Sequence, residues 1–184
     1  MMLDFSAALR SILRHDPDII FIGEIRDGET AQIAVRSSIT GHLVLSTLHT
    51  NDAISAVARL CDMGIEKYMV TSALTGVVAQ RLLKRVCPEC SENHLITREE
   101  AELTGLPEGT VTKTGKGCVS CRNTGYSGRI AIYEFVMITK ELRTAILKGA
   151  YLDELTEIAG GQGMISLKDS CKELLLNGIT SCRE

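Results

Sequence analysis

Four of the seven cysteines form two Cys-x-x-Cys pairs, the spacing in this sequence that points most directly to chemistry. Cys87 and Cys90 frame the first pair, Cys118 and Cys121 the second, and residues 91–117 separate them. Each pair directs two thiolates to one point, and four thiolates match the tetrahedral coordination of Zn²⁺. A redox dithiol is the alternative. Because four thiolates leave no open coordination position, the pattern predicts a structural zinc site.

A second group of candidate residues follows two apolar runs. Residues 19–22 lead through Gly23 to Glu24 and Arg26, and the run 42–48 contains Thr47 and is followed by His49. If both runs are strands of a parallel sheet, these side chains emerge at the edge where open α/β folds bind ligands. A carboxylate there can activate water or hold Mg²⁺ through water. Taken singly, each residue is more often structural, and Arg26 can simply pair with an acid.

The hydrophobic pattern predicts the elements that position these residues. Phe5, Leu9, Ile12 and Leu13 lie on one helical face, and Pro17 restricts Asp16 and ends that helix. The short β-branched run at 19–22 predicts a strand covered on both faces, as in a parallel sheet. Helices are expected over 5–13, 28–41, 53–63 and 67–80, a second buried strand over 42–48, and either a helix end or a strand over 81–86. This alternation predicts a parallel α/β sheet.

The amino-acid composition of the sequence changes at Cys87. From there to Gly128 the chain is polar and rich in glycine and threonine, which predicts a loop segment whose missing core is replaced by bound metal. Apolar strand character returns over 128–138. Short helices are then expected over 140–149, 152–161 and 166–178, the last with Ser166 and Asp169 placed as a capping box.

Composition limits the classes of function. The 184 residues are 45% hydrophobic, which suffices for a core, and carry a net charge of −3 with a pI near 5.8. Neither a signal peptide nor a run of membrane-spanning length occurs, so a cytosolic protein is expected. The acidic balance, and one aromatic residue (Tyr126) in 86–128, argue against nucleic-acid binding. Cys61, Cys171 and Cys182 are expected to be incidental thiols.

Several long stretches resemble one family. "LRSILRHDPDIIFIGEIRDGETAQIA" and "TGHLVLSTLHTNDA" are similar to the Walker B segment and the histidine box of the secretion ATPases that serve type II secretion and type IV pilus assembly. "AQRLLKRVCPEC" and "GCVSCRNTGYSGRIAIYEF" are similar to the zinc-binding tetracysteine module of the same family, and "GITS" to its ending. The resemblance covers nearly the whole chain, with the motifs in the family's order.

The resemblance implies a cytoplasmic, usually hexameric ring ATPase with a RecA-like domain. It uses ATP and Mg²⁺ and drives an inner-membrane platform protein, so the location is cytoplasmic and peripheral at that membrane. The resemblance makes Glu24 the catalytic Walker B glutamate and His49 a histidine-box residue near the γ-phosphate and the subunit interface; whether His42 shares that role is left open. Arg26 and Thr47 are counted with the nucleotide site because of their places at the strand ends. Arg81 matches a recurrent arginine counted here with the nucleotide site, although its role is unassigned. The implied zinc ligands are Cys87, Cys90, Cys118 and Cys121.

No Gly-x-x-x-x-Gly-Lys-[Ser/Thr] loop occurs in the 184 residues, and the family carries this loop before the Walker B strand. The chain is therefore expected to be the C-terminal portion of a longer motor, inactive alone. Its expected parts are a partial RecA-like parallel sheet (1–85), the zinc module (86–128) and a C-terminal strand and helical region (129–184). The tetracysteine favours the secretion and pilus-extension branch over retraction. The alternatives are a non-catalytic, zinc-stabilised adaptor and a zinc-ribbon nucleic-acid binder.

Overall fold

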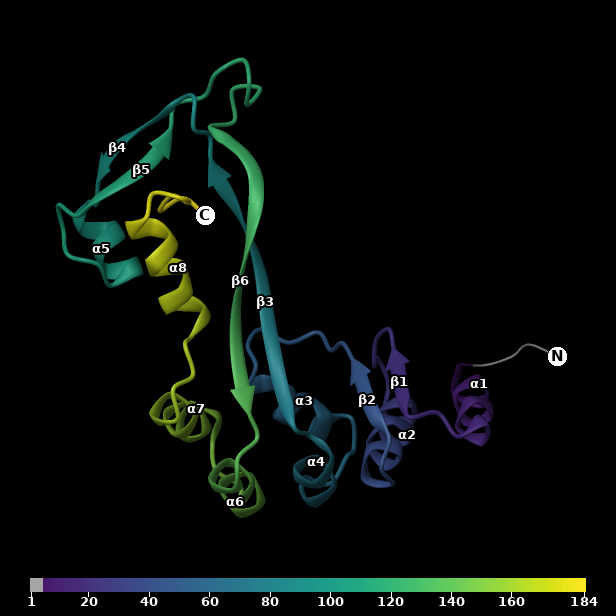
Figure 1. The fold of residues 1–184 in the computed structure, drawn as a ribbon. Coiled ribbons are helices and arrows are strands. Elements are labelled where there is room, and N and C mark those ends of the chain that lie inside the picture. Colours follow the sequence, from purple (N-terminus) through teal and green to yellow (C-terminus); the bar gives the residue numbers. More distant parts are fainter. Residues whose placement is uncertain (1–4) are drawn as a thin grey trace. The chain divides into compact units, whose positions relative to one another are not determined.

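The computed structural model describes residues 5–184 and has the expected mixed α/β character (Figure 1). It divides into two compact units: a first unit of Met1–Val78 and Phe135–Met164, and a second unit of Ala79–Glu134 and Ile165–Glu184. The helices are α1 (Phe5–Ile12), α2 (Gly28–Ile39), α3 (Ser55–Asp62), α4 (Lys67–Ala73), α5 (Arg98–Thr104), α6 (Lys140–Lys148), α7 (Leu152–Gly161) and α8 (Leu167–Leu176), with a 3₁₀ turn η1 (Leu13–His15). The strands are β1 (Ile19–Ile22), β2 (Leu43–Ser46), β3 (Gly76–Val86), β4 (Ser91–Leu95), β5 (Val111–Gly115) and β6 (Tyr126–Met137).

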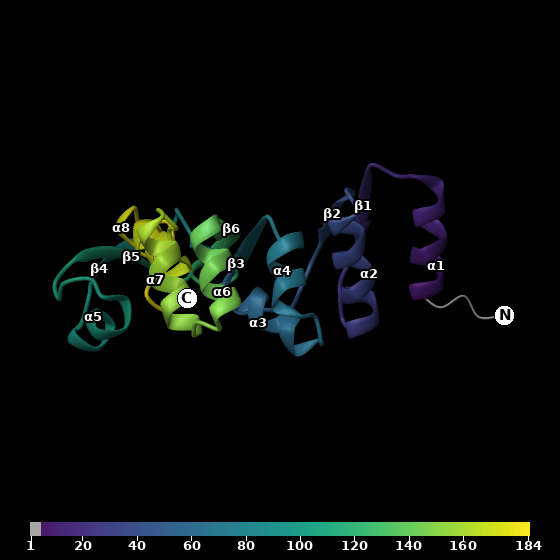
Figure 2. The same ribbon diagram turned by 90° about the horizontal axis from the view of Figure 1, so that it is seen from below.

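The first unit contains the predicted parallel strand pair. β1 and β2 pair in register from Ile19↔Leu43 to Ile22↔Ser46. Helix α2 connects them and packs against β2, α1 and α4 (Figures 1 and 2). The crossover that joins the two strands is therefore helical, as parallel pairing requires.

The expectation that both strands are buried on both faces is wrong. The described residues cover only one face of the pair, so burial alternates along β1, and Phe21 is 73% exposed. Ile19, Leu43 and Leu45 are exposed with it, whereas Ile20 and Ile22 are buried. In the described part of the chain this sheet has two strands. A continuous apolar run cannot tell a face that meets a second layer from one that has none.

The first helix ends before Pro17, as predicted, through η1 and a left-handed Asp16 with φ 51°. Leu9 on its expected apolar face is buried, Ile12 is exposed, and the side chain of Phe5 lies outside the described part.

The expected helix over 67–80 is wrong in its second half. Helix α4 stops at Ala73, and β3 begins at Gly76, which also settles 81–86 as strand. β3 pairs with β6, with Ile138 N donating to Thr75 O at 2.9 Å at one end. A Cβ on Gly76 would lie 3.3 Å from Val136 O, so the absence of a side chain lets the two strands approach closely.

The expectation of a coreless loop between the cysteine pairs is also wrong. β4 and β5 form an antiparallel hairpin whose connection contains α5, and Ile96 beside it is 1% exposed. Thr97 caps α5: its side chain accepts from Glu100 N while the Glu100 carboxylate accepts from Thr97 N. We call residues 86–128 the cysteine module; it has a small core of its own.

The three C-terminal helices occur where expected, and Ser166 caps α8 by accepting from Asp169 N at 3.1 Å. After α8 the chain returns to β3. Val86 N donates to Ile179 O at 2.9 Å, and Lys84 Nζ pairs with Glu184 at 2.7 Å. None of the helices described is long and apolar enough to cross a membrane.

Candidate functional site

Hydrogen bonds join the carboxyl ends of β1 and β2. Thr47 Oγ1 donates to Gly23 O at 2.6 Å, and Ile25 N donates to Thr47 O at 3.0 Å. These two bonds continue the parallel pairing beyond both strands. They fix the segment that carries Glu24 beside the segment that carries His49. The candidate residues that were predicted at the two strand ends therefore lie close together.

An arginine and a histidine side chain flank the carboxylate of Glu24. Arg26 Nε donates to Oε2 at 2.7 Å, and His49 Nε2 lies 2.7 Å from Oε1. The Glu24 side chain is only 19% exposed, against 77% for Arg26 and 87% for His49. His49 reaches Oε1 at ion-pair distance but outside hydrogen-bond geometry, so Oε1 is a buried oxygen without a hydrogen-bond donor among the described residues.

The Arg26 hydrogen bond lowers the pKa of Glu24, against the opposing effect of burial, and Arg26 and His49 add charge attraction. Glu24 is therefore ionised at neutral pH. Oε1 of this ionised carboxylate can accept a hydrogen bond from a water molecule once His49 moves away from it.

Neighbouring Asp27 has a structural task. Its Oδ1 accepts from Thr30 N at 2.8 Å at the start of α2, which lowers the pKa of Asp27. Gly28 follows, where a Cβ would lie within 2.4 Å of Met63 O. Capping and close packing of α2 thus hold the loop that carries Glu24 and Arg26.

Of the other two sequence candidates, His42 is not brought to this cluster, and Arg81 belongs to the second unit. His42 precedes β2 at the opposite end of the strand from Thr47, and its Nδ1 lies 3.0 Å from Ser37 O. Arg81 is an exposed residue of β3 in the second unit, where its Nη1 donates to Gln80 O at 2.9 Å.

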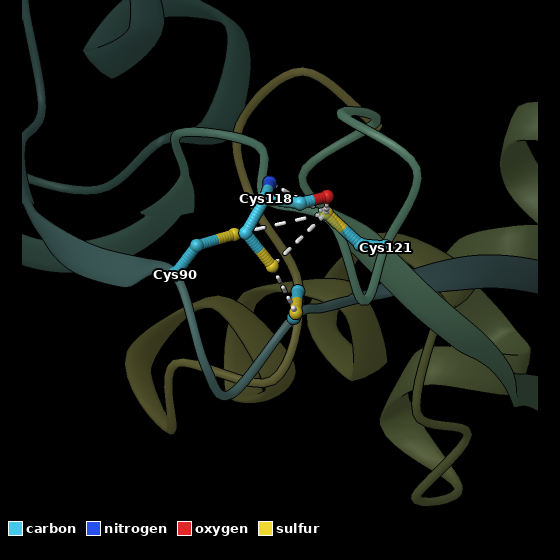
Figure 3. Close-up of side chains that lie close together, drawn as sticks. Cys90, Cys118 and Cys121 are labelled. Atoms are coloured by element: carbon cyan, nitrogen blue, oxygen red, sulfur yellow. Dashed lines mark hydrogen bonds between the residues drawn. The ribbon is translucent and has the colours of Figure 1, made fainter.

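The four predicted cysteines converge in the second unit. Figure 3 shows three of them, Cys90, Cys118 and Cys121. Their Sγ atoms all lie within 4.8 Å of one another; Cys87–Cys118 is 3.9 Å, Cys90–Cys121 is 3.8 Å and Cys118–Cys121 is 3.7 Å. Four sulfurs at about 2.3 Å from a tetrahedral Zn²⁺ would be about 3.8 Å apart. The sulfur cage therefore has the size that a zinc ion requires.

Backbone amides point into this cage. Cys121 Sγ accepts from Cys118 N at 3.1 Å and Gly125 N at 3.3 Å, and Cys90 Sγ accepts from Gly117 N at 3.3 Å. The two amides lower the pKa of Cys121 to about 6, the Cys118 N–H contributing most, whereas burial raises the pKa of Cys90 to about 12. Amide donors of this kind stabilise thiolates.

Two glycines near the second cysteine pair are required by the backbone. Gly117 and Gly125 have φ +96° and +79°, in the left-handed region that favours glycine. Sequence reasoning missed Gly115, where a Cβ would lie 2.0 Å from Gly125 O. A glycine at the end of a polar strand gives no signal of such a close approach.

The chain matches, over residues 1–184, the family described as "Type II/IV secretion system protein". It is 46% identical over 182 residues to the type II secretion system protein E of Dickeya dadantii (strain 3937), which covers 99% of this chain and 36% of that protein. It is 48% identical over 187 residues to the type IV pilus assembly ATPase PilB of Myxococcus xanthus (strain DK1622), covering 99% of this chain and 33% of that protein. The chain thus spans about a third of the length of these relatives.

Two solved structures have a similar fold. The ATPase DotB of Legionella pneumophila superposes with a TM-score of 0.65 at 22% identity, over 98% of this chain and 40% of that one. The pilus retraction motor PilT with bound ADP superposes with a TM-score of 0.54 at 27% identity, over 92% and 43%. Together with the match over all 184 residues, these findings show that the chain belongs to the type II/IV secretion system protein family.

Proposed function

We propose that this chain is the C-terminal part of a motor ATPase that powers type II protein secretion or type IV pilus assembly. The observation that carries the proposal is the ionised carboxylate of Glu24, held at the joined carboxyl ends of two parallel strands, where α/β folds bind ligands. Relatives named as type II secretion protein E and as a pilus assembly ATPase support it.

In the proposed mechanism Glu24 orients a water molecule and accepts its proton through Oε1, the oxygen without a donor. Arg26 and His49 are largely exposed, so they can exchange the carboxylate for phosphate oxygens when nucleotide arrives. Thr47 keeps the two strand ends together. Arg81 stays a proposed nucleotide contact on the resemblance alone, with no role assigned to it. Bound Mg²⁺ would supply positive charge to the phosphates of ATP.

Glu24, Arg26, Thr47 and His49 would supply only part of an ATP-binding site. They offer a base and cationic groups, but the 184 residues contain no Gly-x-x-x-x-Gly-Lys-[Ser/Thr] loop to cradle phosphates. We therefore propose that hydrolysis belongs to a longer protein in which such a loop accompanies this chain. Within it, residues 1–85 would close a RecA-like core, 86–128 form the zinc module, and 129–184 follow as the C-terminal strand and helical region.

For the tetracysteine site we propose one structural Zn²⁺ held by Cys87, Cys90, Cys118 and Cys121. The sulfur spacing and the three amide donors support this ion. When bound, the ion would cross-link the end of β3 to the loop before β6.

The proposed assembly is a hexameric ring, cytoplasmic and peripheral at the inner membrane through a platform protein. This part of the proposal rests on family membership. No nucleic-acid partner is proposed, because the chain carries a net charge of −3.

The deciding experiment measures ATP hydrolysis by a protein that carries this chain together with a phosphate-binding loop, with Glu24 intact and as Glu24→Gln. The second candidate function is a non-catalytic, zinc-stabilised adaptor, favoured by the missing loop and the open apolar face of β1 and β2. A folded, zinc-loaded protein that neither binds nor hydrolyses ATP would support the adaptor.

A further inference from the structure

A second group of metal-ligating side chains lies in the second unit, outside the tetracysteine site. His94 comes from β4, Glu100 from α5 and Cys182 from the segment after α8. One atom of each (an imidazole nitrogen, a carboxylate oxygen and a thiol sulfur) lies within 4.8 Å of the other two. His94 Nε2 and Glu100 Oε2 are 2.7 Å apart, and all three residues are partly buried.

Each of these groups is held by an ordered neighbour. The Glu100 carboxylate is fixed by the capping box, where it accepts from Thr97 N at 2.9 Å. The backbone of His94 pairs with buried Thr112 across the hairpin and accepts from its Oγ1 at 3.2 Å, and the same hydroxyl bonds to the side chain of Cys182. Contacts within the fold therefore hold His94, Glu100 and Cys182 close to one another.

The segment that carries Cys182 is itself anchored. Thr180 Oγ1 donates to Lys84 O at 2.9 Å, and Ser181 Oγ lies 2.7 Å from Tyr126 Oη. The thiol is therefore placed by contacts with β3 and β6 that do not involve His94 or Glu100.

From this geometry we propose that His94, Glu100 and Cys182 form a second Zn²⁺ site, with water in the fourth position. Imidazole, carboxylate and thiolate are all zinc ligands, with bonds of about 2.0–2.3 Å. Tetrahedral coordination at those lengths separates the nitrogen from the oxygen by about 3.4 Å and the nitrogen from the sulfur by about 3.6 Å. The ion pair would open by about 0.7 Å, a change within reach of side-chain rotation.

Such an ion would fasten the segment after α8 to the hairpin at a point separate from the tetracysteine site. The rival interpretation is a His94–Glu100 ion pair with Cys182 as a bystander. On that view the three residues contribute nothing to metal content, whatever they contribute to folding. The proposal does not depend on the ATPase function.

The test is the zinc content of the full chain, produced with zinc, dialysed without chelator and measured by inductively coupled plasma mass spectrometry. We expect two zinc ions per chain, and one in His94→Gln and in Cys182→Ser. Glutamine keeps a hydrogen-bonding group near Glu100, so a purely structural role of His94 leaves the zinc content unchanged. Cys61→Ser, which removes a thiol of the first unit, is the matched control and should keep two.

Cys118→Ser separates this proposal from the tetracysteine site, because it should lose one ion while the second site keeps its own. One zinc ion in the unaltered chain that survives Cys182→Ser overturns the second site. One ion that survives Cys118→Ser but not Cys182→Ser overturns the tetracysteine site instead. With cobalt in place of zinc, Cys182→Ser should lower the sulfur-to-cobalt absorbance by about a fifth, since it removes one thiolate of five.

Discussion

Replacing Glu24 by glutamine tests the proposed mechanism most directly. Glutamine keeps the size of the side chain and one oxygen for Arg26, but it cannot take a proton from water. If Glu24 is the base, ATP hydrolysis should fall roughly 10²- to 10⁴-fold, the usual range for general acid–base catalysis. Nucleotide affinity should survive, because in the proposed mechanism the phosphates are held mainly by a loop outside this chain.

The structure limits how much of that loss an effect on folding could explain. Both ion-pair partners of Glu24 are largely exposed, Arg26 at 77% and His49 at 87%. Water screens such pairs, and they stabilise a fold little. The substitution should therefore leave the melting temperature almost unchanged, and a loss of folded protein cannot account for a hundredfold loss of turnover.

The assay compares turnover, nucleotide affinity and melting temperature in three proteins that carry the phosphate-binding loop: unaltered, Glu24→Gln and Glu66→Gln. Glu66 is an exposed glutamate just before α4, so its substitution makes the same charge change away from the strand ends. The control should match the unaltered protein in all three measurements. Near-normal turnover in a folded Glu24→Gln protein would remove Glu24 from the mechanism.

The pH dependence gives a second readout of the same carboxylate. A base must be ionised to act, and the Arg26 hydrogen bond lowers the pKa of Glu24. The value of kcat/KM, which reports the protein before nucleotide binds, should therefore persist at acidic pH until the pH falls through this lowered value. Arg26→Gln removes the main cause of the shift, so the acidic limb of the profile of kcat/KM against pH should move to higher pH. An unmoved limb would show that another group controls it.

Three further predictions concern the scaffold. Cys118→Ser should remove one zinc ion and increase amide exchange within the cysteine module alone, measured by mass spectrometry; unchanged exchange there would contradict a structural role for the metal. Leu142→Ala, at a 1% exposed position of α6, should lower the free energy of unfolding in urea by about 2–5 kcal/mol, whereas Leu147→Ala, 54% exposed on the same helix, should cost far less. Thr97→Ala should lower the free energy of unfolding in urea at neutral pH by about 0.5–2 kcal/mol, because it removes the hydroxyl that accepts from Glu100 N while keeping the backbone N–H that donates to the Glu100 carboxylate; an unchanged free energy would contradict the cap.

Local signals in the sequence were sufficient for much of the first unit. The apolar run before Gly23 predicted β1, and Pro17 predicted the end of the first helix. Each of these depends on a few neighbouring residues. What failed depends on distant contacts: Gly76–Gln80 is a strand because β6 lies beside it, although the preceding residues favour a helix.

In the candidate sites too, local patterns could be predicted from the sequence and contacts between distant residues could not. Cys-x-x-Cys spacing and strand order sufficed to bring four sulfurs together and to place Glu24 near His49. The bond from Thr47 to Gly23 O could not be foreseen, because a threonine after a strand has many uses. Neither could the meeting of His94 with Cys182, since it depends on the path of the chain after α8.

The uncovered face of β1 and β2 has a practical consequence for handling this chain. Phe21, Ile19, Leu43 and Leu45 present an apolar surface on strands that already have extended geometry. Exposed strands of this kind favour association between copies in solution. Solutions of the 184 residues should therefore aggregate as the protein concentration rises, which light scattering would detect. Charged substitutions at Phe21 and Leu45 should raise the concentration at which aggregation begins, without disturbing the packing of α2 on the opposite face.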